Sequence, residues 1–206
     1  MGAGVLKLYY HPVSTFSQRV RIALLEKQIP AELVEVDLFS RAQFRPEYLA
    51  KNPYARVPTI EENGLVLYES TAILEYLEAT RPSPPLLPVE VGLRAVVAMH
   101  LKLCDLEFAE PARVILLPKR FLPKERWRTD RMEEARARIQ KHLAILETQL
   151  GGREYLVDNR FGLAEVCYAP LLQFLSTLEV EPGPTTAVWA ARLLERPSIM
   201  QTRPAK

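Results

Sequence analysis

The residues best suited to chemistry lie near the start of the chain, where Ser14 follows a short run of aromatic residues. In "YYHPVSTFSQRVRIALLEK" (9–27), a strand-like run stops at His11 and a helical repeat begins just after Ser14. A helix N-terminus offers free N–H groups and the positive end of the helix dipole, which together favour an anion. Serine is also a common N-cap. The residues alone therefore leave two interpretations of Ser14, a structural cap or a hydroxyl that holds an anion.

Two later segments carry similar chemistry, and each also has a plain structural interpretation. Val57 precedes Pro58, and this bond either turns the chain sharply as a cis peptide or starts a strand in the trans form. Ser70 begins a helical repeat directly after Glu69. Its hydroxyl and the first N–H groups of that helix either receive a carboxylate or serve only as a cap.

Composition and charge argue against several other classes of protein. The chain has 206 residues, of which 48% are hydrophobic and 25% charged, and its formal net charge is only +2. That charge predicts no strong field for nucleic acid, and no apolar run approaches the roughly 20 residues of a membrane span. Cys104 and Cys167 form no disulfide framework or metal spacing, and the three histidines are scattered. We therefore expect no metal, nucleic-acid partner or membrane anchor, and a cytoplasmic location.

The first half of the chain predicts an α/β domain. Residues 5–10 and 31–37 are rich in β-branched and aromatic residues, as strands are, and a helical repeat separates them. Strand, helix and strand within about thirty residues form a βαβ unit with parallel strands. Asn63-Gly64 between apolar runs predicts a tight hairpin, since both turn positions need a positive φ. With a helix over residues 69–80, the predicted order is βαβ, helix, ββα, which is typical of a thioredoxin-like sheet.

The second half predicts helices only. Residues 81–88, "RPSPPLLP", are rich in proline and predict a stiff linker at a domain boundary. Residues 126–150 repeat apolar residues every three or four positions, so we expect one long helix that ends at Gly151. The buried stripe of that helix is expected to be Met132, Ala135, Ile139, Leu143, Leu146 and Leu150. Further helices are expected over about 163–178 and 185–195.

In order and spacing, these motifs resemble those of the cytosolic glutathione transferases over nearly the whole chain. "SxFSQRVRIALLEK" resembles the first-helix signature of bacterial, zeta-like and omega-like members, and "VPT" (57–59) resembles the family's cis-proline turn. "ESTAI" (69–73) resembles its glutathione-clamping motif, and "FGLAEVCYAPLL" (161–172) resembles a conserved helix start in its second domain. The resemblance implies an α/β plus all-α protein, with a thioredoxin-like βαβαββα domain followed by an all-helical domain.

The expected domain boundaries follow from the linker and from this resemblance. Residues 1–80 are expected to form the thioredoxin-like domain that binds glutathione. Residues 81–90 are expected to form the proline-rich linker, and residues 91–206 an all-helical domain that lines the site of a second substrate.

The resemblance implies that the anion at Ser14 is the thiolate of glutathione. Ser14 stands where thioredoxins carry their first active cysteine, and as the catalytic residue it would donate a hydrogen bond to the thiolate. Ser17, one helical turn further in, and backbone N–H groups remain alternative donors. The implied protein is a serine-type glutathione transferase that uses glutathione as co-substrate and needs no metal.

Other positions carry over from the family to the binding of glutathione. Val57, before Pro58, would offer its backbone N–H and C=O to the cysteinyl unit, as a paired strand does. Ser70 would hold the γ-glutamyl carboxylate at its helix N-terminus, and Glu69 would take the amino group. Arg56 stands where many relatives have Lys or Gln, and it is a candidate for the glycyl carboxylate.

The implied second substrate is a small electrophile in a cleft beside the helical domain. Tyr10, His11, Phe16 and Cys104 are candidates for lining that cleft. Packing is an equal alternative for Tyr10 and His11, and a buried thiol is the plainer interpretation of Cys104. Substitution, addition, peroxide reduction and isomerisation all use the same thiolate, so the sequence does not select among them. Thr15 and Phe16 replace the second serine and the cysteine usual in zeta-type isomerases, which argues against isomerase activity.

A binding protein is the alternative function. The chain also resembles bacterial stringent-starvation-type proteins, which keep this fold, bind RNA polymerase and lack transferase activity. "PSPP" (82–85) resembles their proline-containing surface patch, but those proteins lose the "SxFS" start that this chain keeps. Retention of Ser14 favours the enzyme, which the resemblance predicts to be a homodimer.

The chain departs from the family pattern at the helix start "FGLAE". Gly162 replaces the usual hydroxyl residue and Glu165 replaces Asp. Glycine at an N-cap costs roughly a few tenths of a kcal/mol relative to serine, and Glu165 can still reach back to the N–H of the cap. We therefore expect a weakened capping box, which affects stability more than function.

Overall fold

A computed structural model describes residues 5–204, and its contacts divide them into two compact units. The first unit contains residues 5–86 and 197–204, and the second contains residues 87–196. The division differs from the expected boundaries at both ends of the second domain, because the first part of the linker and the last helix pack with the first unit.

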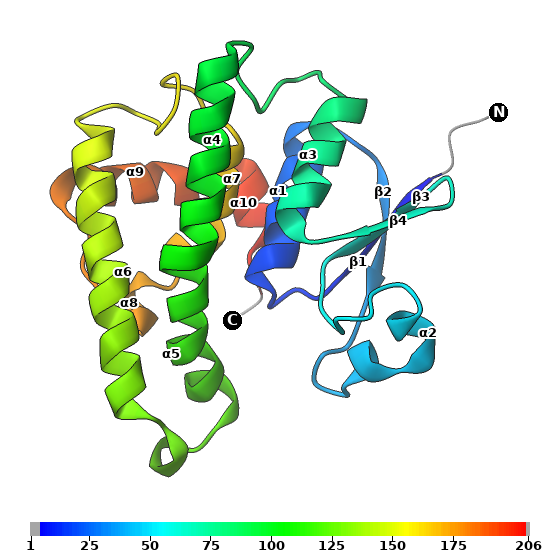
Figure 1. Cartoon of the computed structure of the whole chain (residues 1–206), viewed down its shortest axis with the longest axis horizontal. Coiled ribbons are helices and arrows are strands. Elements are labelled where there is room, and N and C mark those ends of the chain that lie inside the picture. The colour runs from blue at the N-terminus through cyan, green and yellow to red at the C-terminus, as the bar shows by residue number, and fades with distance from the viewer. Residues whose placement is uncertain (1–4, 205–206) are drawn as a thin grey trace. The chain divides into compact units, whose positions relative to one another are not determined.

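The first unit is built on a four-stranded mixed sheet with the order β2-β1-β3-β4 (Figure 1). Its strands are β1 (Leu6–Tyr10), β2 (Ala31–Glu35), β3 (Thr59–Glu62) and β4 (Leu65–Tyr68). β1 and β2 are parallel, whereas β3 is antiparallel to both β1 and β4. Asn63 and Gly64 have φ values of 50° and 83°, so both turn positions have the predicted positive φ. The predicted thioredoxin-like order is therefore confirmed.

Two helices cover one face of this sheet, and a smaller apolar cluster lies on the other. α1 (Thr15–Glu26) and α3 (Ser70–Thr80) lie side by side and pack against each other (Figure 1). Strand residues alternate between faces, so Leu6 and Leu8 are buried while Tyr9 points the opposite way. Around Tyr9 lie Val36, Tyr48 and Val57. The short helices η1 (Ala42–Phe44) and α2 (Pro46–Leu49) carry part of this second cluster.

The last helix of the described chain packs on α1 through polar groups. In α10 (Pro197–Thr202), the Thr202 hydroxyl accepts from Gln18 Nε2 at 3.3 Å, and the Thr202 carbonyl accepts from Arg21 at 3.0 Å. The Ser198 hydroxyl donates to Glu26 at the other end of α1. Polar partners on α1 therefore draw the C-terminal helix into the first unit, which hydrophobic periodicity did not indicate.

The second unit is entirely helical, as predicted. Its elements are α4 (Val91–Leu103), the π-helical turn η2 (Cys104–Ala109), α5 (Glu110–Phe121), η3 (Lys124–Arg126), α6 (Thr129–Leu150), α7 (Leu163–Leu172), α8 (Leu175–Leu178) and α9 (Pro184–Leu194) (Figure 1). All six residues of the predicted α6 stripe are buried, and Gly151 ends α6 with a left-handed φ of 51°. None of the helices in residues 5–204 is long and apolar enough to cross a membrane.

The helix expected over 163–178 is two helices, α7 and α8. The N–H of Phe174 bonds to the carbonyl of Leu171, only three residues back, which tightens and ends α7. Phe174 then takes φ −107° and ψ 8°, outside the helical region, before α8 begins. The apolar repeat continues across this break, so periodicity alone did not indicate it.

A buried ion pair attaches the linker to the first unit. Lys27, just after α1, donates to the carboxylate of Glu78 in α3, and their side chains are only 1% and 6% exposed. Lys27 also donates to the carbonyl of Pro84 at 2.8 Å, and Glu78 accepts the N–H of Leu86 at 3.1 Å. These bonds explain why residues 81–86 belong to the first unit.

We predict that Lys27→Met destabilises the first unit by about 3–5 kcal/mol, because it leaves the Glu78 carboxylate buried without its cation. The double variant Lys27→Met/Glu78→Gln should recover a large part of that loss, since the amide introduced by the second substitution is neutral and its oxygen still accepts from Leu86. Urea unfolding followed by circular dichroism measures both free energies. Additive losses in the double variant would show that the pair is not coupled.

At the start of α7, where Gly162 and Glu165 depart from the family pattern, Glu165 forms the expected bond back to the N-cap. Glu165 accepts the N–H of Gly162 at 3.1 Å and also the N–H of Leu156 at 2.8 Å, and it is 1% exposed. Burial is the largest influence on this carboxyl group and raises its pKa to about 7, against the opposing effect of the backbone donors. The same unit buries His142, whose Nε2 lies 2.9 Å from the Tyr168 hydroxyl and whose pKa burial lowers to about 4.

These two groups make stability depend on pH with opposite signs. The raised pKa of Glu165 means that its protonated form stabilises the fold fully below about pH 4.5, and this contribution is lost as the pH rises through about 7. The lowered pKa of His142 means that its neutral form contributes above about pH 6.5, and this is lost as the pH falls towards 4.

We predict that Glu165→Gln removes the first of these dependences. Between pH 5 and pH 8 the free energy of unfolding of the wild type should fall by about 2–3 kcal/mol relative to the variant, at 1.36 kcal/mol per pKa unit. Urea unfolding followed by tryptophan fluorescence reports on the second unit, since both tryptophans, Trp127 and Trp189, lie in it. A constant difference across this range would mean that Glu165 stays ionised.

Candidate functional site

Ser14 is the N-cap of α1, and the cap leaves its hydroxyl proton available. Ser14 has an extended backbone (φ −80°, ψ 115°), and its Oγ accepts the N–H of Ser17 at 3.1 Å. A hydroxyl has two acceptor lone pairs and one donor proton, so capping uses only a lone pair. The side chain is half-buried, and no residue among 5–204 accepts its proton. The two interpretations of Ser14 are therefore compatible.

Ser17 differs from Ser14 in its exposure. Ser17 is completely buried, and its Oγ accepts the N–H of His11 at 3.4 Å. Its hydroxyl therefore faces the turn before α1, and of the two serines only Ser14 has a partly exposed side chain.

The register of the sheet gathers the three sequence motifs at one end of the sheet. Tyr9 near the end of β1 lies opposite Thr59 at the start of β3, and Thr59 lies opposite Tyr68 at the end of β4. The turn to Ser14 follows β1, Val57-Pro58 precedes β3, and Glu69-Ser70 follows β4. All three segments therefore leave the sheet at the same end, which we call the Ser14 end of the sheet.

The turn at Val57-Pro58 is cis and is held by a polar cluster. The Tyr48 hydroxyl donates to the carbonyl of Arg56 at 2.6 Å and lies 3.0 Å from the Thr59 hydroxyl. Asn52 Nδ2 bonds the same two groups at 2.9 and 3.2 Å. Burial raises the pKa of Tyr48, so its phenol remains a donor. Among the described residues, neither the N–H nor the C=O of Val57 has a hydrogen-bond partner.

The third segment carries an unusual backbone conformation. Glu69 is exposed and has φ 72° and ψ 115°, a combination that costs a non-glycine residue about 1–3 kcal/mol and often marks functional sites. Ser70 begins α3 and is 3% exposed, and its hydroxyl accepts from Arg19 at 3.3 Å. The first N–H groups of α3 have no partner within the helix, and a buried guanidinium lies close to them.

Arg19 is a residue to which the sequence analysis assigned no role in the site. It is 1% exposed, and its guanidinium lies 4.7 Å from the centroid of the Phe16 ring. Its spacing contained a signal, because Arg19 follows Phe16 by three residues and precedes Ala23 by four, which puts it on the same helix face as the core.

The remaining candidates fall in different surroundings. Tyr10 and Phe16 are half-buried and each packs against an arginine, whereas His11 is 4% exposed and makes edge contact with Phe39 at 5.3 Å. The side chain of Arg56 is exposed. Cys104 belongs to the second unit, where it is completely buried. The structure thus brings Ser14, Val57 and Ser70 to one end of the sheet, and the lining of a cleft by the other residues stays a prediction.

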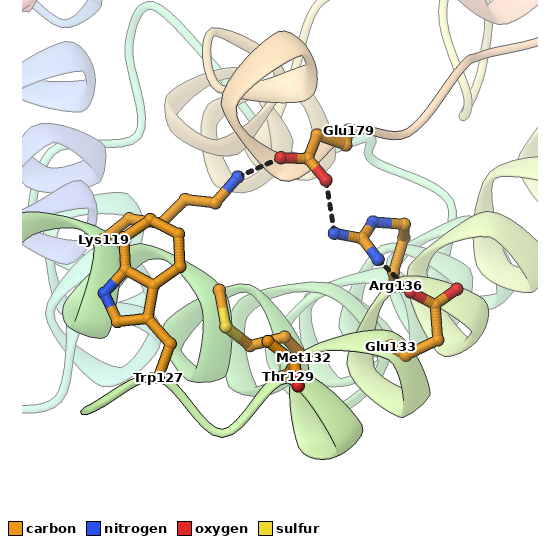
Figure 2. A pocket seen from close by; sticks show the side chains of 7 residues that line it. All are labelled: Lys119, Trp127, Thr129, Met132, Glu133, Arg136 and Glu179. Carbon is orange, nitrogen blue, oxygen red and sulfur yellow. Dashed lines mark hydrogen bonds and ion pairs between the residues drawn. The ribbon is translucent and has the colours of Figure 1, made fainter. Parts of the chain in front are cut away.

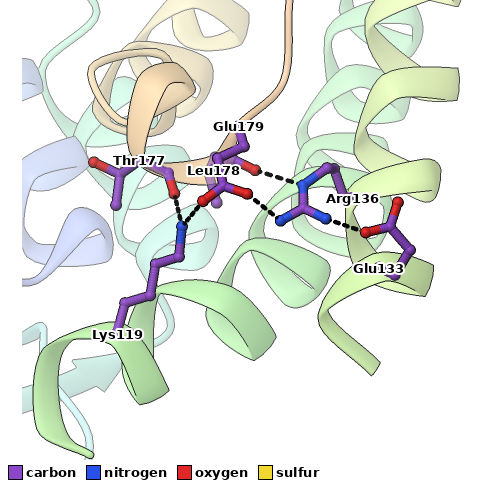
Figure 3. A network of polar contacts seen from close by, with 6 residues as sticks. All are labelled: Lys119, Glu133, Arg136, Thr177, Leu178 and Glu179. Atoms are coloured by element: carbon purple, nitrogen blue, oxygen red, sulfur yellow. Dashed lines mark hydrogen bonds and ion pairs between the residues drawn. The ribbon is translucent and has the colours of Figure 1, made fainter. Parts of the chain in front are cut away.

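The second unit contains a hollow of about 240 Å³ between α5, α6 and α8 (Figure 2). Its lining consists of Lys119, Trp127, Thr129, Met132, Glu133, Arg136 and Glu179. The charges in this lining are already paired (Figure 3). Glu179 accepts from Lys119 and from Arg136 at 2.5 Å each. Lys119 also donates to the carbonyl of Thr177, and Arg136 to that of Leu178, both in α8. This arrangement fastens α8 to its neighbours and leaves little capacity for a ligand.

No group of three or more His, Cys, Asp or Glu side chains within residues 5–204 has the arrangement of a metal site. The fold and the Ser14 end of the sheet thus define a thioredoxin-like domain with a serine at the N-terminus of its first helix, joined to a helical domain.

Comparison with known proteins identifies the family. The profile described as "Glutathione S-transferase, N-terminal domain" matches residues 8–85, and the profile described as "Glutathione S-transferase, C-terminal domain" matches residues 129–193. The chain belongs to the glutathione S-transferase superfamily.

Individual relatives carry three different names. Maleylacetoacetate isomerase of Rattus norvegicus is 32% identical over 212 residues, which cover 100% of this chain and 95% of that protein. The stringent starvation protein A homolog of Coxiella burnetii is 31% identical over 183 residues (89% and 82%). Glutathione S-transferase F6 of Arabidopsis thaliana is 29% identical over 204 residues (95% and 98%).

Solved structures confirm the fold. A crystal structure of a glutathione transferase homolog from sulfitobacter, with bound glutathione, superposes with a TM-score of 0.83 at 23% identity and covers 96% of both chains.

We predict that Tyr48→Phe lowers the free energy of unfolding of the first unit by about 1 kcal/mol. The variant loses the bonds of the Tyr48 hydroxyl to the Arg56 carbonyl and the Thr59 hydroxyl, while Asn52 still bonds both groups. Tyr54→Phe is the matched control, since Tyr54 lies in the same segment but is 63% exposed. Urea unfolding measures both variants. Equal effects in the two would argue against the polar cluster as the support of the Val57-Pro58 turn.

Proposed function

We propose that this protein is a glutathione transferase in which the hydroxyl of Ser14 donates a hydrogen bond to the thiolate of bound glutathione. One observation carries the proposal: Ser14 caps α1 with a lone pair, and its donor proton has no acceptor among the described residues. That proton lies at the N-terminus of α1 and at the Ser14 end of the sheet. Membership of the family and the glutathione named in a structure of similar fold supply the ligand.

The magnitudes are sufficient for ionisation near neutral pH. A free thiol with a pKa of about 8.5 is only about 3% ionised at pH 7. A hydrogen bond to a charged acceptor contributes roughly 1.5–3 kcal/mol, and a helix N-terminus adds about 0.3–1 kcal/mol. Their sum, about 2–4 kcal/mol, lowers the thiol pKa by about 1.5–3 units at 1.36 kcal/mol per unit. Most of the bound sulfur would then be thiolate without a general base.

The other segments at the Ser14 end of the sheet would hold the rest of the tripeptide. Val57 would pair its free N–H and C=O with the cysteinyl unit, as one strand pairs with another. The N-terminus of α3 and the Ser70 hydroxyl would receive the γ-glutamyl carboxylate, while the exposed carboxylate of Glu69 would pair with the amino group. Arg56, whose side chain is exposed, would approach the glycyl carboxylate.

The thiolate would attack a small electrophile. Positioning of the two substrates and stabilisation of charge account for the rate in this scheme. Tyr10 and Phe16, which are half-buried in the first unit, remain proposed contacts of the electrophile, and its identity and the type of reaction stay open. The name of the rat relative raises isomerisation as one of these reactions, while Thr15 and Phe16 argue against it.

A non-catalytic binding protein is the second candidate. The stringent starvation protein A homolog of Coxiella burnetii is as similar to this chain as the enzymes are. Retention of Ser14 and of its available proton favours the enzyme. A homodimer remains an expectation from the family resemblance.

We predict that three variants separate the cap from the donor. Ser14→Thr keeps both functions, Ser14→Asp keeps the cap without a donor proton, and Ser14→Ala keeps neither. The pKa of the bound thiol should rise by about 1–2 units in the Asp and Ala variants, with turnover near neutral pH about 10- to 100-fold lower, and should change little in the Thr variant. Ultraviolet absorbance of the thiolate and rates with a model electrophile across pH are the measurements.

Equal activity of wild type and Ser14→Ala would move the role to backbone donors or Ser17. Failure of the wild type to bind immobilised glutathione, together with copurification of RNA polymerase, would favour the binding protein instead.

A further inference from the structure

We propose that His11 is a positioning residue for Ser14: its ring nitrogen Nδ1 fixes the turn that presents the Ser14 hydroxyl. This inference rests on the proposed function and assigns His11 a role other than contact with the electrophile.

A closed set of hydrogen bonds joins His11 to Ser14. The carbonyl of His11 accepts the N–H of Ser14 at 3.0 Å, which closes a four-residue turn with Pro12 at its second position, where proline is favoured. Nδ1 of the same residue accepts the N–H of Val13 at 3.2 Å. Ser17 then connects the turn to α1, because its Oγ accepts from the N–H of His11 and its own N–H donates to Ser14 Oγ.

The bond to Val13 resembles the turn that Asn and Asp make with the N–H two residues further on. It restricts the orientation of the peptide between Pro12 and Val13, directly before Ser14. Without it, the turn would lose one of the hydrogen bonds that hold it, and the Ser14 hydroxyl would sample more orientations.

The surroundings of the ring fix its position and its tautomer. His11 is 4% exposed, it packs edge-on against Phe39, and its Nε2 lies 3.9 Å from the Glu35 carboxylate of β2. An imidazole nitrogen accepts a hydrogen bond only when it carries no proton. The bond from Val13 N–H to Nδ1 therefore assigns the proton of a neutral ring to Nε2, on the side of Glu35. A ring held in this way acts on Ser14 through the backbone.

Two substitutions test the acceptor rather than the bulk of the ring. His11→Asn places a carbonyl oxygen close to the position of Nδ1 and can keep the bond to Val13. His11→Gln places its amide close to the position of Nε2 and cannot. We expect the pKa of the bound thiol to rise and kcat/KM at mildly acidic pH to fall about 3- to 10-fold in the Gln variant, with both values within about twofold of the wild type in the Asn variant.

A double-variant cycle separates positioning of Ser14 from a general structural effect. In a Ser14→Ala background, His11→Gln should have no further effect on the thiol pKa, since there is no hydroxyl left to position. Nitrogen NMR of the wild-type imidazole gives a readout independent of any variant, and we expect the Nε2–H tautomer at neutral pH.

Three results would overturn the inference: an unchanged thiol pKa in His11→Gln, an equal loss in His11→Asn, or a proton on Nδ1. A shift of the thiol pKa in Ser14→Ala without one in His11→Gln would reject the role of His11 alone. The absence of a shift in Ser14→Ala would reject the proposed function itself.

Discussion

The hydrogen bond from the N–H of Ser17 to the hydroxyl of Ser14 is the contact on which the rest of the candidate site depends. It begins α1, so it sets where the helix N-terminus and its free N–H groups lie. It also fixes the Ser14 side chain through a lone pair, so the hydroxyl proton stays available to another acceptor. The Ser14 hydroxyl can therefore cap α1 and donate to an anion at the same time, because a hydroxyl both accepts and donates hydrogen bonds.

A second constraint, the antiparallel register of β3, brings the other groups to that hydroxyl. With Thr59 opposite both Tyr9 and Tyr68, the segments that flank these residues must emerge at one end of the sheet. The sequence predicted part of this arrangement from local signals, because an Asn-Gly hairpin indicates the pairing of β3 with β4 and apolar runs mark the strands. The pairing of β3 with β1 joins distant residues, and only the predicted thioredoxin-like order implied it. The predicted stripe of α6 and the reach of Glu165 to its cap were equally local, and both are present.

Features that depend on contacts between distant residues were not predicted. Burial of Arg19 follows from α3, more than fifty residues away, which supplies Ser70 as a partner. The assignment of α10 to the first unit follows from Thr202 meeting Gln18 and Arg21. Lys27 follows α1 directly, and Glu78 makes its burial possible and binds the linker as well. In each case a polar side chain is buried because a partner from another element satisfies it, and no local pattern carries that information.

Several polar groups at the Ser14 end of the sheet lack a hydrogen-bond partner within the described chain. The Ser14 proton, the backbone of Val57 and the first N–H groups of α3 have no hydrogen-bond partner among residues 5–204, although the segments that carry them are firmly held. Tyr48 and Asn52 hold the turn before Val57, and Glu69 adopts a costly conformation just before α3. Buried polar groups of folded chains seldom lack a hydrogen-bond partner. In the proposed complex, glutathione would pair them through its thiolate, the peptide unit of its cysteinyl residue and its γ-glutamyl carboxylate.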